Sequence, residues 1–146
     1  MAKLQYSWNQ VTRGDIISFI YKNKEGRRLR RTILVLEPRL LNRAKNKGST
    51  FLLHGIQLEV SNRPTNVEVK KILESAGTPE IVDEEKKIYR VELKDTTQVI
   101  YKKLRVLIRR HGIYRTYNYD EAKRSSVFLE DLRLPAQFLK ELKDEN

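Results

Sequence analysis

The chain has 146 residues, 39% hydrophobic and 34% charged, which suits one domain with a buried core. It contains no cysteine, and this excludes disulfides, a thiolate nucleophile and cysteine-ligated metals. Thirty lysines and arginines against nineteen acidic residues give a net charge of +11. No stretch approaches the roughly 18 apolar residues of a membrane helix, and the opening residues do not resemble a signal peptide. We therefore expect a soluble cytoplasmic protein, or a virion protein if the chain is of phage origin.

The positive charge is concentrated in two windows. Residues 22–47 hold ten basic and two acidic side chains, and residues 101–124 hold eight basic and two acidic ones. The windows therefore carry +8 and +6, and the rest of the chain carries −3. Clustered cations favour polyanions because binding releases condensed counterions. Nucleic acid is the partner that this pattern favours, and a merely solvated basic face is the alternative.

The first half of the chain is typical of strands. Segments rich in β-branched and aromatic residues predict strands at 16–21, 32–36 and 51–56. The continuous apolar run at 32–36 indicates a strand covered on both faces, ended by Glu37-Pro38. Residues 42–48 predict a polar, basic loop, and Gly55 indicates a bulge or a close backbone approach.

The second half adds helices. Thr65 and Glu68 form a capping box for a helix that ends at Gly77, before Pro79. A second helix begins at 95–98 and ends before Gly112. Its apolar face comprises Ile100, Leu104, Leu107 and Ile108, and its opposite, basic face comprises Lys102, Arg105 and Arg109. The remaining predicted elements are strands at 87–93 and 126–134 and a closing helix at 135–144.

Many short strands with a few helices predict an α+β domain, and a small β-barrel would protect its strand edges. We expect the barrel core at about 10–62 and 113–134, and a helical, basic insertion at about 65–112. Tyr6 and Trp8 would cover one barrel end.

The sequence contains no recognisable catalytic constellation. His54 and His111 are the only histidines, and we interpret them as a core residue and a cation at a helix C-terminus. Phosphate-binding glycine motifs and the G-x-S-x-G motif are absent. We expect no metal, no cofactor and no small-molecule substrate.

Two local features favour nucleic acid. The segment Arg27-Arg28-Leu29-Arg30-Arg31 leads from a loop into the most apolar strand, as a flexible cationic arm on a rigid wall. The segment 114–119 interleaves Arg115 with three tyrosines, which can stack on bases while the cation contacts phosphate. A strand with Tyr114 and an alternating partner in the core is the alternative.

Four short motifs occur in order along the chain: Arg13-Gly14-Asp15-Ile16, Arg31-Thr32-Ile33-Leu34-Val35, Thr50-Phe51-Leu52-Leu53, and Ser126-Val127 leading to Arg133. Over residues 12–60 and 124–142 they resemble the PemK/MazF family, small SH3-like barrels of toxin–antitoxin systems. KOW-type barrels also open with Gly-Asp before a strand. The resemblance implies an SH3-like barrel and does not explain the helical insertion.

Members of the PemK/MazF family are typically dimeric ribonucleases that cleave single-stranded RNA without a metal, using an arginine and a threonine. The resemblance places that arginine at Arg31, but Gln57 stands where the family has threonine, and Thr32 replaces the family's proline. Thr50 or Ser49 would have to supply the hydroxyl. The resemblance therefore supports the barrel and weakens the enzyme.

We expect a non-catalytic basic barrel that binds RNA or DNA through the backbone. The expected contacts are basic side chains of the two windows: Arg27, Arg28, Arg30, Arg31, Lys45, Lys102, Arg105, Arg109 and Arg115. One alternative is an endoribonuclease that uses Arg31 and Thr50. The other is a structural or assembly protein, such as a virion component, a homodimer or a subunit on an acidic partner. The sequence leaves open whether the two basic patches share one face.

Overall fold

A computed structural model of the chain describes residues 3–23, 25–43, 49–58, 66–83, 85 and 88–130. The predictions that fall outside these residues include the contact by Lys45 with most of the loop at 42–48, the cap at Thr65, the end of the strand at 126–134 and the closing helix at 135–144. Everything below concerns the described part of the chain.

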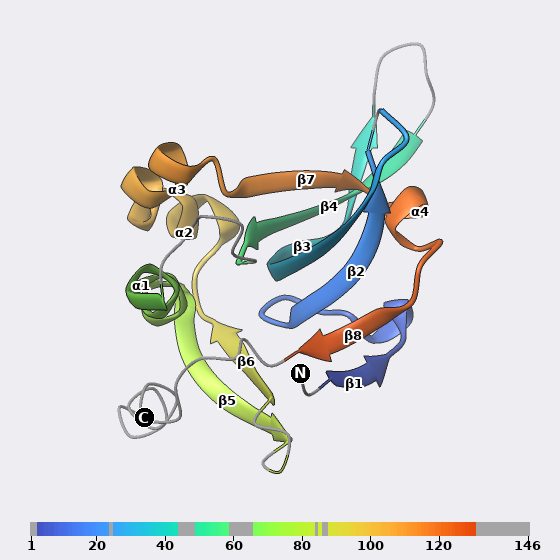
Figure 1. Ribbon diagram of the computed structural model, residues 1–146. Helices are drawn as coiled ribbons and strands as arrows, with labels where there is room; N and C mark the ends of the chain where they lie inside the picture. The colour runs from blue at the N-terminus through green and yellow to red at the C-terminus, as the bar shows by residue number, and fades with distance from the viewer. Residues whose placement is uncertain are drawn as a thin grey trace.

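Six of the described strands form one antiparallel sheet in the order β1-β8-β2-β3-β4-β7 (Figure 1). These strands are β1 (Lys3–Tyr6), β2 (Ile16–Lys22), β3 (Arg28–Arg43), β4 (Ser49–Gln57), β7 (Tyr114–Asn118) and β8 (Val127–Glu130). In the described part of the chain no pairing joins β1 to β7, so the sheet has two free edges. The domain is of the mixed α+β kind.

The central strand β3 is covered on both faces, as its apolar run predicted. Leu34 and Leu36 belong to one hydrophobic core and Ile33 and Val35 to another, and all four are fully buried. The predicted end at Glu37-Pro38 is wrong, because β3 continues to Arg43. Register shifts against β4 fall between Val35 and Leu40, so the proline lies where the ladder is already irregular and a missing N–H costs little.

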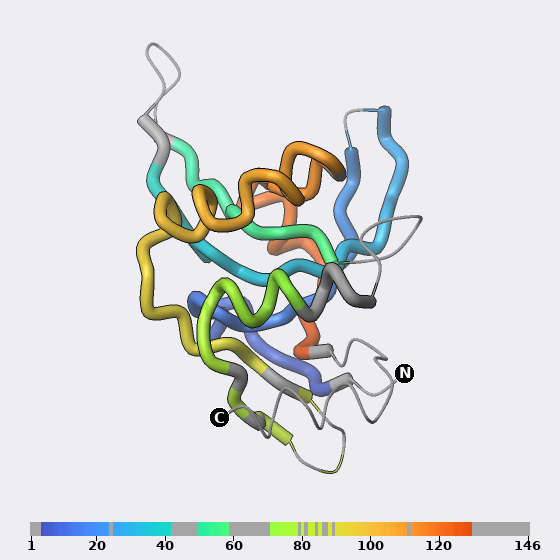
Figure 2. The backbone as a smooth tube through the Cα atoms, turned by 90° about the vertical axis from the view of Figure 1, so that its left-hand side faces the viewer, coloured from blue at the N-terminus to red at the C-terminus, as the bar shows by residue number. Residues whose placement is uncertain are grey.

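The outer face of the sheet is covered by the insertion, in a core that we call the helix-side core. Figure 2 looks onto this side, with α1 in green and α2 and α3 in orange in front of the strands. The insertion comprises α1 (Asn66–Ala76), β5 (Gly77–Asp83), β6 (Ile88–Leu93), α2 (Thr97–Lys103) and α3 (Arg105–His111). Strands β5 and β6 pair as a separate two-stranded sheet. The sequence did not predict β5, because Gly77 and Pro79 are typical helix terminators.

The single helix predicted after residue 95 is two short helices. Leu104 leaves the helical conformation at φ −103° and ψ 10°, which ends α2 and begins α3. The predicted apolar face is confirmed, since Ile100, Leu104, Leu107 and Ile108 are all buried in the helix-side core. Gly112 caps α3 at φ 60°, a left-handed conformation that glycine adopts without strain.

The inner face of the sheet encloses a second core, the inner core, which is rich in aromatic residues. The 3-10 helix η1 (Trp8–Gln10) and the short helix α4 (Tyr119–Ala122) flank it. The indole of Trp8 packs edge-on against Phe19 and Tyr119 and donates a 2.8 Å hydrogen bond to the Ser125 carbonyl. Trp8 therefore has a packing role.

The Arg13-Gly14-Asp15 motif joins the sheet to the β5–β6 hairpin. The Gly14 carbonyl accepts from the Val91 amide at 2.8 Å, and a Cβ on Gly14 would lie 1.8 Å from the Val91 oxygen. Asp15 is buried and pairs with Arg90 at 3.0 Å. Burial raises the pKa of Asp15 above its ordinary value, and the Thr12 amide and Arg90 oppose this. The motif therefore has a structural role here.

Candidate nucleic-acid interface

The sheet curls so strongly that its edge strand β7 returns to β2, although β3 and β4 lie between them in the pairing order. The Tyr117 ring lies 4.9 Å from that of Tyr21 and 5.3 Å from that of Phe19. The Asn118 amide donates to the Tyr21 hydroxyl at 3.1 Å. These contacts fix β7 over β2 and form the floor of a cleft.

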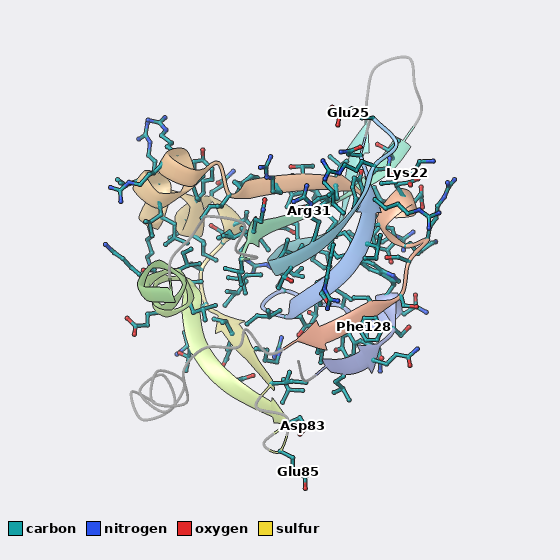
Figure 3. All side chains as sticks on the ribbon, in the orientation of Figure 1. Lys22, Glu25, Arg31, Asp83, Glu85 and Phe128 are labelled. Atoms are coloured by element: carbon teal, nitrogen blue, oxygen red, sulfur yellow. The ribbon has the colours of Figure 1, made fainter. Side chains whose placement is uncertain are left out.

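This cleft has a volume of about 690 Å³, and most of the residues that line it are polar or charged. It is lined by Tyr21, Lys22, Asn23, Arg31, Arg115, Thr116, Tyr117, Asn118, Glu121 and Arg124. Figure 3 places the labelled Arg31 and Lys22 in the same upper region of the molecule. The lining comes from β2, β3, β7, α4 and the turn after α4.

A smaller hollow of about 270 Å³ adjoins the cleft and shares Lys22, Glu121 and Arg124 with it. It adds Arg28 from β3, together with Ile20 and Ser125. We call the two hollows together the basic cleft. Among the described residues that line it are five cations (Lys22, Arg28, Arg31, Arg115 and Arg124) and one carboxylate, that of Glu121.

Arg115 is positioned by Gln57. Its Nε donates to the Gln57 Oε1 at 2.9 Å, and Gln57 is only 9% exposed. Because Nε is engaged, the two Nη groups remain as donors for a ligand. Gln57, which stands where the PemK/MazF family has threonine, is therefore a hydrogen-bond acceptor that orients Arg115 in the cleft.

Glu121 limits the positive charge of the cleft. Its carboxylate pairs with Arg124 at 3.4 Å, and because the Arg124 side chain is 79% exposed the ion pair contributes little stability. The Asn118 side chain caps α4 by accepting from the Glu121 amide at 3.0 Å. Glu121 is thus held beside the cations, where it competes with any incoming anion for Arg124.

The arginine segment 27–31 is not a flexible arm. Residues 28–31 are paired with β2 through Lys22↔Arg28 to Phe19↔Arg31, and the Asn23 side chain closes the turn by accepting from two amides. Arg27, Arg28 and Arg30 are exposed. Arg31 lines the cleft, whereas Arg30 donates to the Ser18 hydroxyl at 3.2 Å. The strand pairing splits the segment between the two faces of the sheet.

The second predicted patch lies elsewhere. Lys102, Arg105 and Arg109 are all exposed, as predicted, on α2 and α3. Figure 1 shows these helices at one end of β7 and the β2–β3 hairpin toward the other. Arg115 on β7 follows the second patch in the chain but lines the basic cleft.

The structure does not bring Thr50 to Arg31. Thr50 pairs with Asn42 near the end of β3, whereas Arg31 pairs with Phe19 near its beginning. Ser49 pairs with Arg43, one step further away. The Thr50 hydroxyl therefore does not supply the partner that a ribonuclease centred on Arg31 would need.

His54 is a half-buried residue of β4. Its Nδ1 lies 2.9 Å from the Tyr114 hydroxyl and 3.3 Å from the Thr116 Oγ1, and its buried Nε2 has no hydrogen-bond partner among the described residues. Burial lowers the pKa of His54, partly offset by Glu37. Within the described ranges no cluster of three or more potential ligands could hold a metal.

Sequence reasoning found Arg28, Arg31 and Arg115 but singled out neither Lys22 nor Arg124. Both lie at the ends of the two basic windows, so charge counting included them without distinguishing them. The roles of Tyr21, Asn118 and Glu121 depend on the curl that brings β7 to β2, and no local sequence signal shows this curl.

Comparison of the chain with models of protein families, with curated proteins and with solved structures finds no match. No helix in the described part of the chain has the length and apolar character needed to span a membrane. Function is therefore inferred from the charge and geometry of the site itself.

Proposed function

We propose that this protein binds the sugar–phosphate backbone of nucleic acid in the basic cleft, without catalysing a reaction. The observation that carries the proposal is that four cations (Lys22, Arg31, Arg115 and Arg124) line one hollow with a single carboxylate among them, and that Arg28 lines the adjoining hollow. They project from paired strands and from the turn after α4, so little conformational freedom of the backbone is lost on binding.

The chemistry of the lining fits phosphate better than other anions. Arginine presents planar, paired donors that match phosphate oxygens, and four of the five cations are arginines. Tyr21 and the asparagine amides add neutral hydrogen-bonding groups and an aromatic edge. Phosphate contacts position a strand without specifying its sequence, so we propose RNA or DNA as a general ligand.

The fold that accompanies this proposal is a small SH3-like barrel of the PemK/MazF or KOW type, with residues 65–112 as its helical insertion. The curl of the six-stranded sheet and the contact between β7 and β2 support it. In such a barrel the basic cleft would lie at one open end, between the β2–β3 hairpin and β7.

The proposal is tested by fluorescence anisotropy with labelled RNA and DNA oligomers across a salt series. Five phosphate contacts predict a slope of about −3.5 to −4.5 in log affinity against log salt. Arg31→Gln with Arg115→Gln should weaken binding. A control with Lys71→Gln and Lys94→Gln removes the same charge from exposed positions outside the cleft. Equal losses in the two variants, or absence of binding at low salt, would overturn the proposal.

An endoribonuclease is the second candidate, and it is favoured by one observation. Arg31 shares the cleft with Arg115 and with the carboxylate of Glu121, so a cation and a potential base line the same surface. Incubation of mixed RNA with the protein and a chelator, resolved on a gel, tests it. Cleavage that Arg31→Ala abolishes would establish the enzyme, and intact RNA at saturating protein would leave Arg31 as a phosphate contact.

A further inference from the structure

A separate hollow of about 510 Å³ lies where α2 meets the start of β7. It is lined by Thr97, Gln98, Tyr101, Lys102 and Tyr114, and we call it the tyrosine pocket. It shares no lining residue with the basic cleft. Its volume falls in the range of small-ligand sites, about 300–1,000 Å³.

The walls of the tyrosine pocket are held by contacts of their own. The Tyr101 and Tyr114 rings meet edge to face at 5.3 Å between centroids. The Tyr114 hydroxyl forms a 2.9 Å hydrogen bond with the His54 Nδ1, and the Thr97 hydroxyl donates a 2.7 Å hydrogen bond to the Glu37 carboxylate. The pocket is therefore formed before any ligand arrives, which lowers the entropic cost of binding.

The rim of the pocket carries two polar side chains that do not contribute to holding the fold together. Gln98 and Lys102 are exposed, and neither side chain has a hydrogen-bond or ion-pair partner within the described ranges. The Gln98 amide can both donate and accept, and Lys102 is a free cation. Arg105, one turn further along and also exposed, adds positive charge to the same pair of helices.

We propose that the tyrosine pocket takes one nucleobase of a bound nucleic-acid strand. The base stacks on the Tyr101 ring, Gln98 contacts its polar edge, and Lys102 contacts the adjoining phosphate. Aromatic rings beside an amide and a cation suit a ligand that is planar, polar at its edge and anionic at one end. This inference rests on the proposed nucleic-acid binding and adds a base contact to it.

The two sites are joined by β7, since Tyr114 lines the tyrosine pocket and the next residue, Arg115, lines the basic cleft. Successive residues of a strand point to opposite faces, so a ligand touching both sites crosses the β7 edge. In the described part of the chain β7 pairs only with β4, so its other edge has no strand partner, although the Asn118 amide at its end donates to the Tyr21 hydroxyl.

The first test compares two labelled strands of equal length, one carrying bases and one abasic, against the wild type and Tyr101→Leu. The wild type should prefer the base-containing strand, and Tyr101→Leu should lose about fivefold or more of its affinity for that strand while binding the abasic strand unchanged. Gln98 is exposed, so Gln98→Ala should not disturb the fold. This variant should also lose affinity for the base-containing strand, by a smaller factor than Tyr101→Leu.

Two outcomes separate this inference from the proposed function. If both strands bind with the salt dependence of the basic cleft but Tyr101→Leu and Gln98→Ala change neither affinity, the base pocket is wrong and the backbone proposal stands. If neither strand binds, the backbone proposal is wrong.

Base binding in the tyrosine pocket is then tested separately, by an NMR titration with nucleoside 5′-monophosphates and with inorganic phosphate. Shifts at residues 97–102 with the nucleotides alone would support the pocket. The same shifts with phosphate, or none, would overturn it.

Discussion

The basic cleft and the helical pair α2–α3 are comparably rich in positive charge, yet they present it differently. In the cleft, strand pairing and the curl of the sheet bring cations from four segments to two adjoining hollows that share Lys22 and Arg124. On the helices, Lys102, Arg105 and Arg109 project outward, and of these three only Lys102 lines one of the hollows described above. Concentrated charge in the sequence thus indicates a polyanion partner, whereas the curvature of the sheet determines where several cations can contact one ligand.

The largest expected effect sets the two regions against each other directly. The double variant Arg31→Gln, Arg115→Gln removes two phosphate contacts from the cleft. Its affinity should fall by about 25- to 60-fold at 0.1 M salt, because the counterions that these two contacts displace are no longer released. The triple change Lys102→Gln, Arg105→Gln and Arg109→Gln removes one charge more but should cost less than about tenfold, if only Lys102 contacts a phosphate. Anisotropy titrations measure both. A larger loss in the triple variant would place the main interface on the helices.

The next effect has the opposite sign and concerns only the cleft. Glu121→Gln frees Arg124 from its 3.4 Å ion pair and removes the one carboxylate among the described lining residues. Affinity should rise by about five- to eightfold at 0.1 M salt, the equivalent of one phosphate contact. Asp120→Gln, at a neighbouring exposed position outside the lining, is the matched control. A rise of equal size in the control would show that net charge matters and that the cleft does not.

A smaller effect tests how the cleft positions its arginine. Gln57→Leu leaves the charge of Arg115 intact but removes the acceptor of its 2.9 Å hydrogen bond. Affinity should fall by a few-fold, since a hydrogen bond of this kind contributes about 1 kcal/mol. The salt slope should stay the same, because the number of cations is unchanged. A change of slope equal to one lost contact would mean that Arg115 needs Gln57 to reach the ligand at all.

The smallest effect concerns folding near the tyrosine pocket. Because burial lowers the pKa of His54, the folded chain binds that proton less readily than the unfolded chain. The contribution of neutral His54 to folding stability is fully present above its pKa in the unfolded chain, about 6.5. This contribution is lost as the pH falls from that value through the lower pKa of the folded chain. The drop in melting temperature from pH 7.5 to pH 5 should therefore be smaller in His54→Gln than in the wild type. An equal drop in both proteins would contradict this assignment.

Much of the fold is readable in the sequence because its signals are local. The apolar run at 32–36 predicted a doubly covered strand, and the spacing from Ile100 to Ile108 predicted the buried helical face. The break at Leu104 and the strand β5 were not predictable, because tertiary packing there overrides the local propensity for a continuous helix or for a loop. The continuation of β3 past Pro38 depends on a bulge that only the pairing partner shows.

The candidate site was predictable only in part, for the same reason. Arg31 and Arg115 were found because each lies in a basic segment, but nothing in the sequence places them on one surface. Lys22 and Arg124 are separated by about a hundred positions and line the same two hollows because β8 pairs with β2 and the Ile20 amide donates to the Ser125 hydroxyl beside Arg124. Thr50 was a candidate partner of Arg31 only for the ribonuclease alternative, and the register separates them, because Thr50 on β4 pairs with Asn42 near the end of β3 and Arg31 lies near its beginning.

The most direct test of the central claim is an NMR titration of the isotope-labelled protein with a short oligonucleotide at low salt. Binding in the basic cleft predicts that the largest shifts fall on residues 21–23, 31, 115–118 and 121–124, with smaller shifts at 97–102. Shifts confined to α3, or saturation of the oligonucleotide with no shift at Arg31 and Arg115, would contradict it.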